Sequence, residues 1–266
     1  MLASELRLLF GRARTRALLA VLACVPILLA VAVRLSGGPA RDEGPDFLAQ
    51  VSHNGVFVAL AGLTVTMPFF LPLAVSMVAG DTVAGEAGMG TLRALLFRPV
   101  GRTRLLVTKY ATAALFCLAA TFVIAGAGLL AGAVLFPLGR VTMLSGATVP
   151  LGEGVMRSLG AAGVVGLSML GLAAVGLFVS TLTESPMAAM AVTAGVAITS
   201  EILDAIPQLR AIHPALFTHR WYAFGDLLRT AGGMSAIERD LLLQLAWALV
   251  FGLAAWARFT TKDVLA

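Results

Sequence analysis

The sequence predicts an all-α integral membrane protein with six transmembrane helices and an amphipathic helix ahead of the first one. Two observations support this fold class. Of the 266 residues, 59% are hydrophobic and only 12% are charged, whereas about a quarter of the residues of a soluble domain are charged. The apolar residues are also gathered into six runs of about the length that a helix needs to cross a hydrocarbon core roughly 30 Å thick. Lipid is therefore the expected solvent for most of the chain.

We expect one transmembrane domain over residues 1–266. Its spans cover approximately residues 17–33, 56–79, 110–136, 156–179, 187–206 and 241–257. The first run has a basic flank like that of a signal peptide, but no small-x-small cleavage site follows it, so we interpret it as a retained anchor. Pro68 and Pro72 lie inside the second span and predict a kink there.

The first 16 residues predict a helix that lies flat at the membrane surface. Apolar side chains share one face of this helix, and Glu5 and the basic residues lie around the rest of it. The apolar side chains are those of Leu2, Leu6, Leu9, Phe10 and Ala13. A basic amphipathic helix of this kind binds at the interface beside anionic lipid head groups. The alternative is an ordinary positively charged flank of the first span.

The distribution of basic residues predicts the orientation. Six spans place both termini on one side, and 11 of the 19 basic residues then fall on that side, with 8 on the other. Because basic residues accumulate in cytoplasmic segments, we expect the chain in a cell (inner) membrane with cytoplasmic N- and C-termini. The sequence pI near 10 is then explained by the basic residues on the cytoplasmic side. We therefore expect membrane lipid as a partner and no nucleic acid.

A polar segment interrupts the apolar runs between the second and third spans. It reads GDTVAGEAGMGTLRALLFRPVGRTRLLVTK and covers residues 80–109. Its glycines break the helix, Thr91 can cap a short new helix, and Pro99 ends that helix. The prediction is a cytoplasmic elbow that presents an apolar face ringed by arginines. Such a face normally has a partner, although a helix lying on lipid is an alternative.

This segment resembles the signature loop of the ABC-2 permeases, the membrane subunits of type 2 ABC exporters. The family pattern has a Glu, then Gly-Thr-Leu, an apolar pair, Pro-Val and a basic stretch that ends near a lysine. The matching residues are Glu86, Gly90, Thr91, Leu92, Leu95, Leu96, Pro99, Val100, Arg102 and Lys109. Thr108 stands where the family often has Gly. The six-span plan, the amphipathic amino terminus and the aromatic segment after the fifth span are also similar.

The resemblance implies that the elbow is a coupling helix that docks on a separate cytoplasmic ABC ATPase. Two ATPase copies would work with two permeases, the second being another copy of this chain or a paralogous permease. A smaller inner contact is implied for the loop around Glu184. The residues implied in ATPase coupling are Asp81, Gly85, Glu86, Gly90, Thr91, Leu92, Leu95, Leu96, Arg98, Pro99 and Glu184.

We expect no catalytic activity in this chain. A P-loop needs a lysine followed by Ser or Thr, but the two lysines are followed by Tyr110 and Asp263. Neither a zinc-protease motif nor a nucleophile elbow is present in the sequence. No catalytic residue or cofactor is therefore expected here, and ATP and Mg²⁺ would bind in the partner ATPase.

The outer end of the fifth span carries acidic residues. Glu201 and Asp204 are three residues apart and share a helical face. Ionisable groups at membrane depth are functional candidates, so we consider both as residues of a translocation path or outer gate, the alternative being that they mark the helix end. Residues 207–240 predict an outer interfacial segment, with Trp221 and Tyr222 as further gate candidates. The three histidines are scattered in sequence, so we expect no metal.

Three function classes remain open from the sequence. The first is the permease subunit of an ATP-driven exporter, with hydrophobic, drug-like or lipid-like cargo. The second is an ion-coupled secondary transporter that uses Glu201 and Asp204 as proton carriers, although no internal repeat supports it. The third is a non-transporting sensor or scaffold built on the same permease plan.

Overall fold

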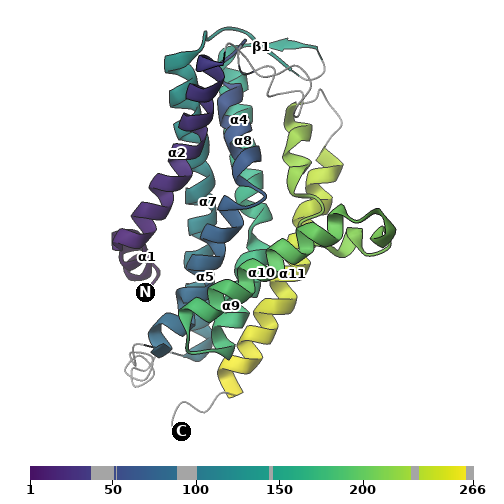
Figure 1. Ribbon diagram of the computed structural model, residues 1–266. Helices are drawn as coiled ribbons and strands as arrows, with labels where there is room; N and C mark the ends of the chain where they lie inside the picture. The colour runs from purple at the N-terminus through teal and green to yellow at the C-terminus, as the bar shows by residue number, and fades with distance from the viewer. Residues whose placement is uncertain (37–50, 52, 89–100, 144–145, 229–233, 262–266) are drawn as a thin grey trace.

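The structure, a computed structural model, describes residues 1–36, 51, 53–88, 101–143, 146–228 and 234–261 (Figure 1). Long helices packed side by side dominate the described part. The α-helices are α1 (Leu2–Gly11), α2 (Ala13–Leu35), α4 (Phe57–Thr66), α5 (Phe70–Gly88), α7 (Arg102–Leu135), α8 (Leu151–Ser168), α9 (Leu170–Leu182), α10 (Pro186–Ala205) and α11 (Met234–Thr261). Three 3₁₀ turns, η1 (Pro207–Leu209), η2 (His213–Ala215) and η3 (Trp221–Leu228), follow α10. A hairpin of β1 (Val141–Thr142) and β2 (Thr148–Val149) precedes α8.

Among the described residues, five helices are long and apolar enough to cross a membrane, and a bent pair brings the number to six. These helices overlap the six predicted ranges. The bent pair is α4 and α5, whose axes differ by 60° across a short break. Pro68 lies in that break, so the kink predicted from the prolines is present and is sharper than a simple bend. The fourth predicted span is divided at Met169, where α8 ends and α9 begins.

Three predicted boundaries differ from the structure. The N-terminal helix α1 ends at Gly11, five residues before the expected end of the interfacial helix, because Arg12 is extended at its C-cap. Helix α7 begins at Arg102 and not at Tyr110, so the basic residues 102–109 form the first turns of this helix. Helix α11 begins at Met234, which places Asp240 inside a helix instead of in the outer segment. In the last two cases the helix continues through charged residues because its neighbours provide partners for them.

Small residues allow close helix packing in this bundle. A Cβ atom built on Gly132 would lie 2.0 Å from the carbonyl oxygen of Gly55, and one on Gly128 would lie 2.6 Å from the Cα atom of Ala59. The small residues of α7 therefore pack within the chain, against α4 and against Gly55, two residues before α4 begins. Backbone approach of this kind holds helices together where lipid removes the hydrophobic driving force between them.

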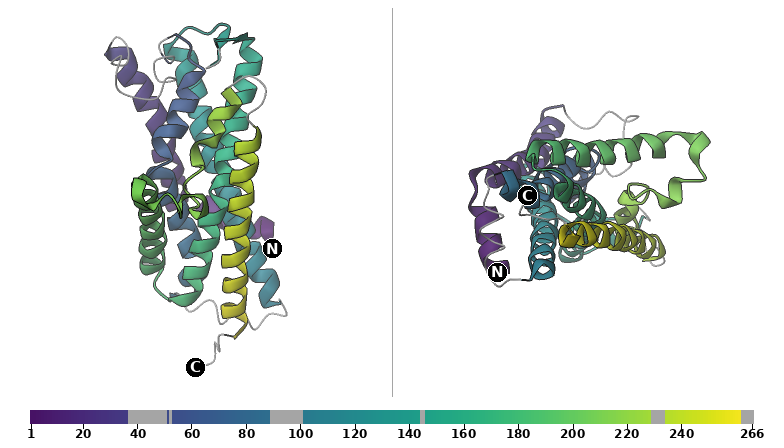
Figure 2. Two further views of the ribbon diagram at one scale, coloured as in Figure 1. Left: turned by 90° about the vertical axis from the view of Figure 1, so that its right-hand side faces the viewer. Right: turned by 90° about the horizontal axis from the view of Figure 1, so that it is seen from below.

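The two ends of the bundle differ. The β1–β2 hairpin lies at one end, whereas α1 and the C-terminal part of α11 lie toward the other (Figure 1). Seen along the bundle, α1 and α10 appear nearly side-on (Figure 2), so both run across its long axis. Helix α10 carries the chain out from the side of the bundle, and the 3₁₀ turns bring it back (Figures 1 and 2). We call residues 201–228, the end of α10 with the three turns, the lateral arm.

Candidate functional site

The predicted coupling segment is described only at its two sides. Asp81, Gly85 and Glu86 lie in the last turns of α5, and Glu184 lies between α9 and α10. The other residues predicted to contact an ATPase lie outside the described residues. They are Gly90, Thr91, Leu92, Leu95, Leu96, Arg98 and Pro99. The site is therefore built from the helices that enter and leave this segment.

A buried lysine joins three helices at this end of the bundle. Lys109 of α7 is only 3% exposed, and its Nζ lies 2.5 Å from Oε1 of Glu86 on α5. Glu5 on α1 brings a second carboxylate to 3.9 Å from the same nitrogen. A charged group this deeply buried needs a charged or hydrogen-bonding partner to offset its desolvation. The pairing therefore fixes α1 and α5 against α7.

A second ion pair joins the start of α2 to α5. The Arg12 guanidinium lies 2.8 Å from Oδ2 of Asp81. A Cβ atom at position 85 would lie 2.5 Å from Oδ1 of Asp81, so the glycine one turn later leaves room for this carboxylate. Both ion pairs line one cleft between the N-terminal helices and α5 and α7. Asp81 and Glu86 thus line the same cleft, and Gly85 lies beside the Asp81 carboxylate.

The last turns of α5 are also fixed to α9 and to the following loop. The Ser180 hydroxyl accepts hydrogen bonds from the backbone N–H groups of Val83 and Ala84, at 2.9 and 2.8 Å. A Cβ atom on Gly88 would lie 2.8 Å from the carbonyl oxygen of Glu184. The structure thus brings together the two inner contacts that the sequence placed far apart. Ser180 was missed, because a serine in an apolar helix gives no signal in sequence.

The start of α7 is attached to the end of α11. The Arg102 guanidinium donates to the carbonyl oxygen of Thr260 at 2.9 Å, and the Trp256 indole N–H donates to the Thr103 hydroxyl at 2.9 Å. These contacts begin immediately after residues 89–100. Both sides of the predicted coupling segment are therefore connected to several transmembrane helices.

The lateral arm holds the four predicted gate residues. Trp221 is fully buried, and its indole N–H donates to the carbonyl oxygen of Ser168 at the α8–α9 break. It serves to anchor the arm to the bundle. Tyr222 is half exposed, and partial burial together with the nearby Glu201 carboxylate raises the pKa of its phenol. Trp221 and Tyr222 thus have different environments although they are adjacent.

A buried polar cluster beneath the arm was not predicted. Asp240 of α11 is fully buried and accepts hydrogen bonds from the Ser168 hydroxyl and from the Gln244 amide. The same amide donates to the carbonyl oxygen of Phe217 at 2.7 Å. The cluster joins α8, α11 and the arm. The cluster was not predicted because the sequence placed Asp240 in the outer segment before the last span.

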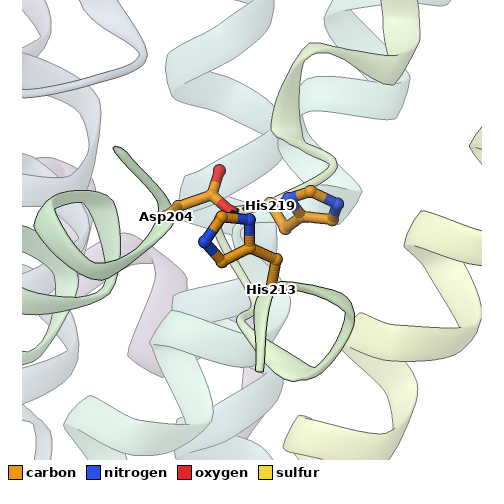
Figure 3. A group of neighbouring side chains, drawn as sticks. All are labelled: Asp204, His213 and His219. Atoms are coloured by element: carbon orange, nitrogen blue, oxygen red, sulfur yellow. Dashed lines mark hydrogen bonds and ion pairs between the residues drawn. The ribbon is translucent and has the colours of Figure 1, made fainter. Parts of the chain in front are cut away.

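Asp204 meets two histidines on the arm (Figure 3). Its Oδ1 lies 2.6 Å from Nδ1 of His219 and 3.7 Å from Nδ1 of His213. The three side chains can place one potential ligand atom each within 4.8 Å of one another. The expectation that the histidines are scattered is wrong for these two, because the 3₁₀ turns fold the chain back on the end of α10.

Comparisons with known proteins agree with a membrane location. Residues 45–265 match the family described as a protein of unknown function, DUF2705. The chain belongs to this family. A curated relative, the probable ABC transporter permease protein NosY of Pseudomonas aeruginosa, is 33% identical over 98 residues. This match covers 37% of the present chain and 36% of that protein, so the chain spans about a third of the relative it matches.

The DUF2705 match includes all the residues predicted for coupling and for the gate, whereas α1, α2 and Arg12 precede it. The apolar helices and the permease similarity together make this DUF2705 chain a multi-pass membrane protein. The ion pairs that connect α1 and Arg12 to α5 and α7 lie partly outside the residues that the family match covers.

Proposed function

We propose that the chain is the membrane permease subunit of an ATP-driven ABC exporter of the ABC-2 type. A separate cytoplasmic ATPase would supply the energy by moving residues 89–100. The observation that carries the proposal is the buried Lys109–Glu86 ion pair, which joins the helices on both sides of that segment. A displacement of the segment would move α5 and α7 as one body, which is what coupling requires.

Further contacts support transmission from this body to the other helices. Ser180 connects α5 to α9. A Cβ atom on Gly80 would lie 2.8 Å from the backbone nitrogen of Met190, so α5 and α10 touch through their backbones. Closely packed elements of this kind shift as rigid units rather than deform continuously. Helix α10 leads directly to the lateral arm, so the same motion would reach the gate candidates.

The complex that we propose contains two ATPase subunits and two permeases, the second permease being a copy of this chain or a paralogue. ATP and Mg²⁺ would bind in the ATPases, so this chain would have no enzymatic activity of its own. Segment 89–100 and both termini would face the cytoplasm, in line with the basic residues on that side. The apolar surfaces of the helices favour a hydrophobic, drug-like or lipid-like cargo.

The test is co-purification with the candidate ATPase, followed by measurement of ATP hydrolysis in proteoliposomes. We expect the wild-type permease to bind the ATPase and to stimulate it. Leu92→Asp should abolish binding, because it places a charge on the predicted docking face. Lys109→Met should keep binding but reduce stimulation several-fold, because α5 and α7 are then no longer held together.

Glu153→Gln is the matched control, because it removes an exposed ion pair with Arg157 on α8. Its stimulation should equal that of the wild type. The proposal is lost if Leu92→Asp and Lys109→Met both leave binding and stimulation intact. Because Lys109→Met is also expected to lower stability, stimulation is compared per amount of folded protein from size-exclusion chromatography; stimulation that is then equal to wild type would count against coupling.

A further inference from the structure

The geometry of the lateral arm points to a binding site for a divalent transition-metal ion of the Zn²⁺ class. The ligands that we propose are one carboxylate oxygen of Asp204 and the Nδ1 atoms of His213 and His219. The carboxylate comes from the last turn of α10, His213 begins η2, and His219 lies just before η3 (Figure 3). This inference is independent of the proposed transport function.

The distances agree with a shared metal ion. Ligands bound to tetrahedral Zn²⁺ at about 2.0–2.1 Å lie roughly 3.3 Å from one another. The two separations from Asp204 Oδ1, 2.6 and 3.7 Å, fall on either side of that value. All three candidate ligand atoms lie within 4.8 Å of one another, so shifts of about 1 Å in the side chains would bring them to the spacing of a shared metal ion.

The hydrogen bonding of His213 supplies an independent argument. Its Nε2 lies 3.1 Å from the carbonyl oxygen of Ile206. A carbonyl can only accept, so Nε2 carries the hydrogen and a neutral His213 has its lone pair on Nδ1. That lone pair faces the Asp204 carboxylate, which is also an acceptor. Two acceptors that face each other are stabilised by a cation between them, either a proton on Nδ1 or a metal ion, and the test below distinguishes the two.

The same hydrogen bond is the one that metal-binding histidines usually make. Such a histidine donates its second ring N–H to a backbone carbonyl or carboxylate, which fixes the ring and its tautomer. The backbone around the site is also fixed, because the His219 N–H donates to the Leu216 carbonyl and the Leu216 N–H donates to the His213 carbonyl. Trp221, two residues after His219, is anchored at Ser168. The ligands are therefore held in place before an ion arrives.

The ligand types select the kind of ion. Two imidazoles and one carboxylate suit Zn²⁺ and similar divalent transition metals, whereas Mg²⁺ and Ca²⁺ prefer sites made of oxygen ligands. The side chains are 13%, 32% and 26% exposed for His213, His219 and Asp204. A bound ion would thus be reached from outside the bundle and would keep at least one position open for water or another ligand.

The test uses the full-length protein in detergent, purified without a polyhistidine tag and stripped of metal with a chelator. We expect Zn²⁺ to bind with one equivalent per chain in competition with a chromophoric chelator and to raise the Tm. Co²⁺ bound at the same site should show the visible absorption bands that are typical of a four-coordinate cobalt ion. Excess Mg²⁺ should displace neither ion.

His213→Ala and His219→Ala should each weaken Zn²⁺ binding at least tenfold, and Asp204→Asn should do the same. His53→Ala is the matched control, because it removes the third histidine of the chain from outside the cluster, and it should bind as the wild type does. Far-UV circular dichroism and size-exclusion chromatography check that each variant is folded. A wild type that binds no Zn²⁺ at tens of micromolar would overturn the inference. So would a folded double variant, His213→Ala with His219→Ala, that keeps wild-type affinity.

Discussion

Lys109 on α7 and Glu86 on α5 form a buried ion pair, with 2.5 Å between Nζ and Oε1. In sequence they lie on either side of residues 89–100, so the pair holds together the two helices that lead into and out of that segment. Without the pair, α5 and α7 could move more easily relative to each other. The first of the four predictions below tests this pair, and the other three test contacts elsewhere in the bundle.

The first prediction concerns the stability of the pair. Lys109→Met leaves Glu86 and Glu5 without their shared cation in a poorly solvated cleft, and removing one partner of a buried ion pair costs about 3–5 kcal/mol. We expect a clear loss of Tm in detergent. Lys109→Met combined with Glu86→Gln should recover part of the loss, because the carboxylate that faced Lys109 is then neutral. No recovery in the double variant would mean that the two residues are not energetically coupled.

The second prediction concerns the polar cluster under the lateral arm. Asp240→Ala removes the acceptor for the Ser168 hydroxyl and for the Gln244 amide. The Ser168 hydroxyl can still donate to the Val164 carbonyl and the Gln244 amide to the Phe217 carbonyl, but the second amide N–H of Gln244 loses its acceptor. One buried donor left without a partner costs about 1–3 kcal/mol, so we expect a lower Tm and easier proteolysis of the arm. Glu238→Gln, on the same helix at an exposed position, should change neither. Equal effects of both variants would contradict the assigned role of Asp240.

The third prediction concerns helix packing. Gly132→Ala places a methyl group where the Gly55 carbonyl now lies, and overpacking of this kind costs roughly 1–3 kcal/mol. Gly126→Ala on the same helix meets no atom within 4 Å. It should be neutral or slightly stabilising, since alanine is the better helix former by up to about 1 kcal/mol. Thermal unfolding of the two variants compares them directly.

The fourth prediction concerns the connection between α5 and α9. Ser180→Ala removes the acceptor that Val83 and Ala84 share, so their amide hydrogens should exchange with solvent faster. Thr181→Val is the control, because the Thr181 hydroxyl bonds within its own helix, to the Phe178 carbonyl. Hydrogen exchange followed by mass spectrometry on peptides covering residues 79–88 measures the difference. Unchanged exchange in Ser180→Ala would remove this link from the coupling path.

The candidate site was predictable only where its signal is local. Glu86 and Glu184 were selected from sequence, and the described structure places both at the same end of the bundle. Their contacts were not predictable: neither the Lys109–Glu86 pair nor the approach of Gly88 to the Glu184 carbonyl has a fixed sequence spacing. The burial of Trp221 was also not predictable, since a tryptophan near an interface looks the same in sequence whether it faces lipid or, as here, is fully buried.

By itself, the sequence determined the number and position of the apolar helices, the proline kink and the polar interruption at residues 80–109. This was possible because the thickness and apolar character of the bilayer constrain each helix separately. A span can therefore be recognised from about 20 consecutive residues. Only the tertiary structure decided that α11 carries Asp240 into the bundle and that Lys109 joins three helices. It also decided that Asp204 meets His213 and His219. These features depend on how α10 and the 3₁₀ turns fold back, and contacts between distant residues are set by packing, which no local pattern records.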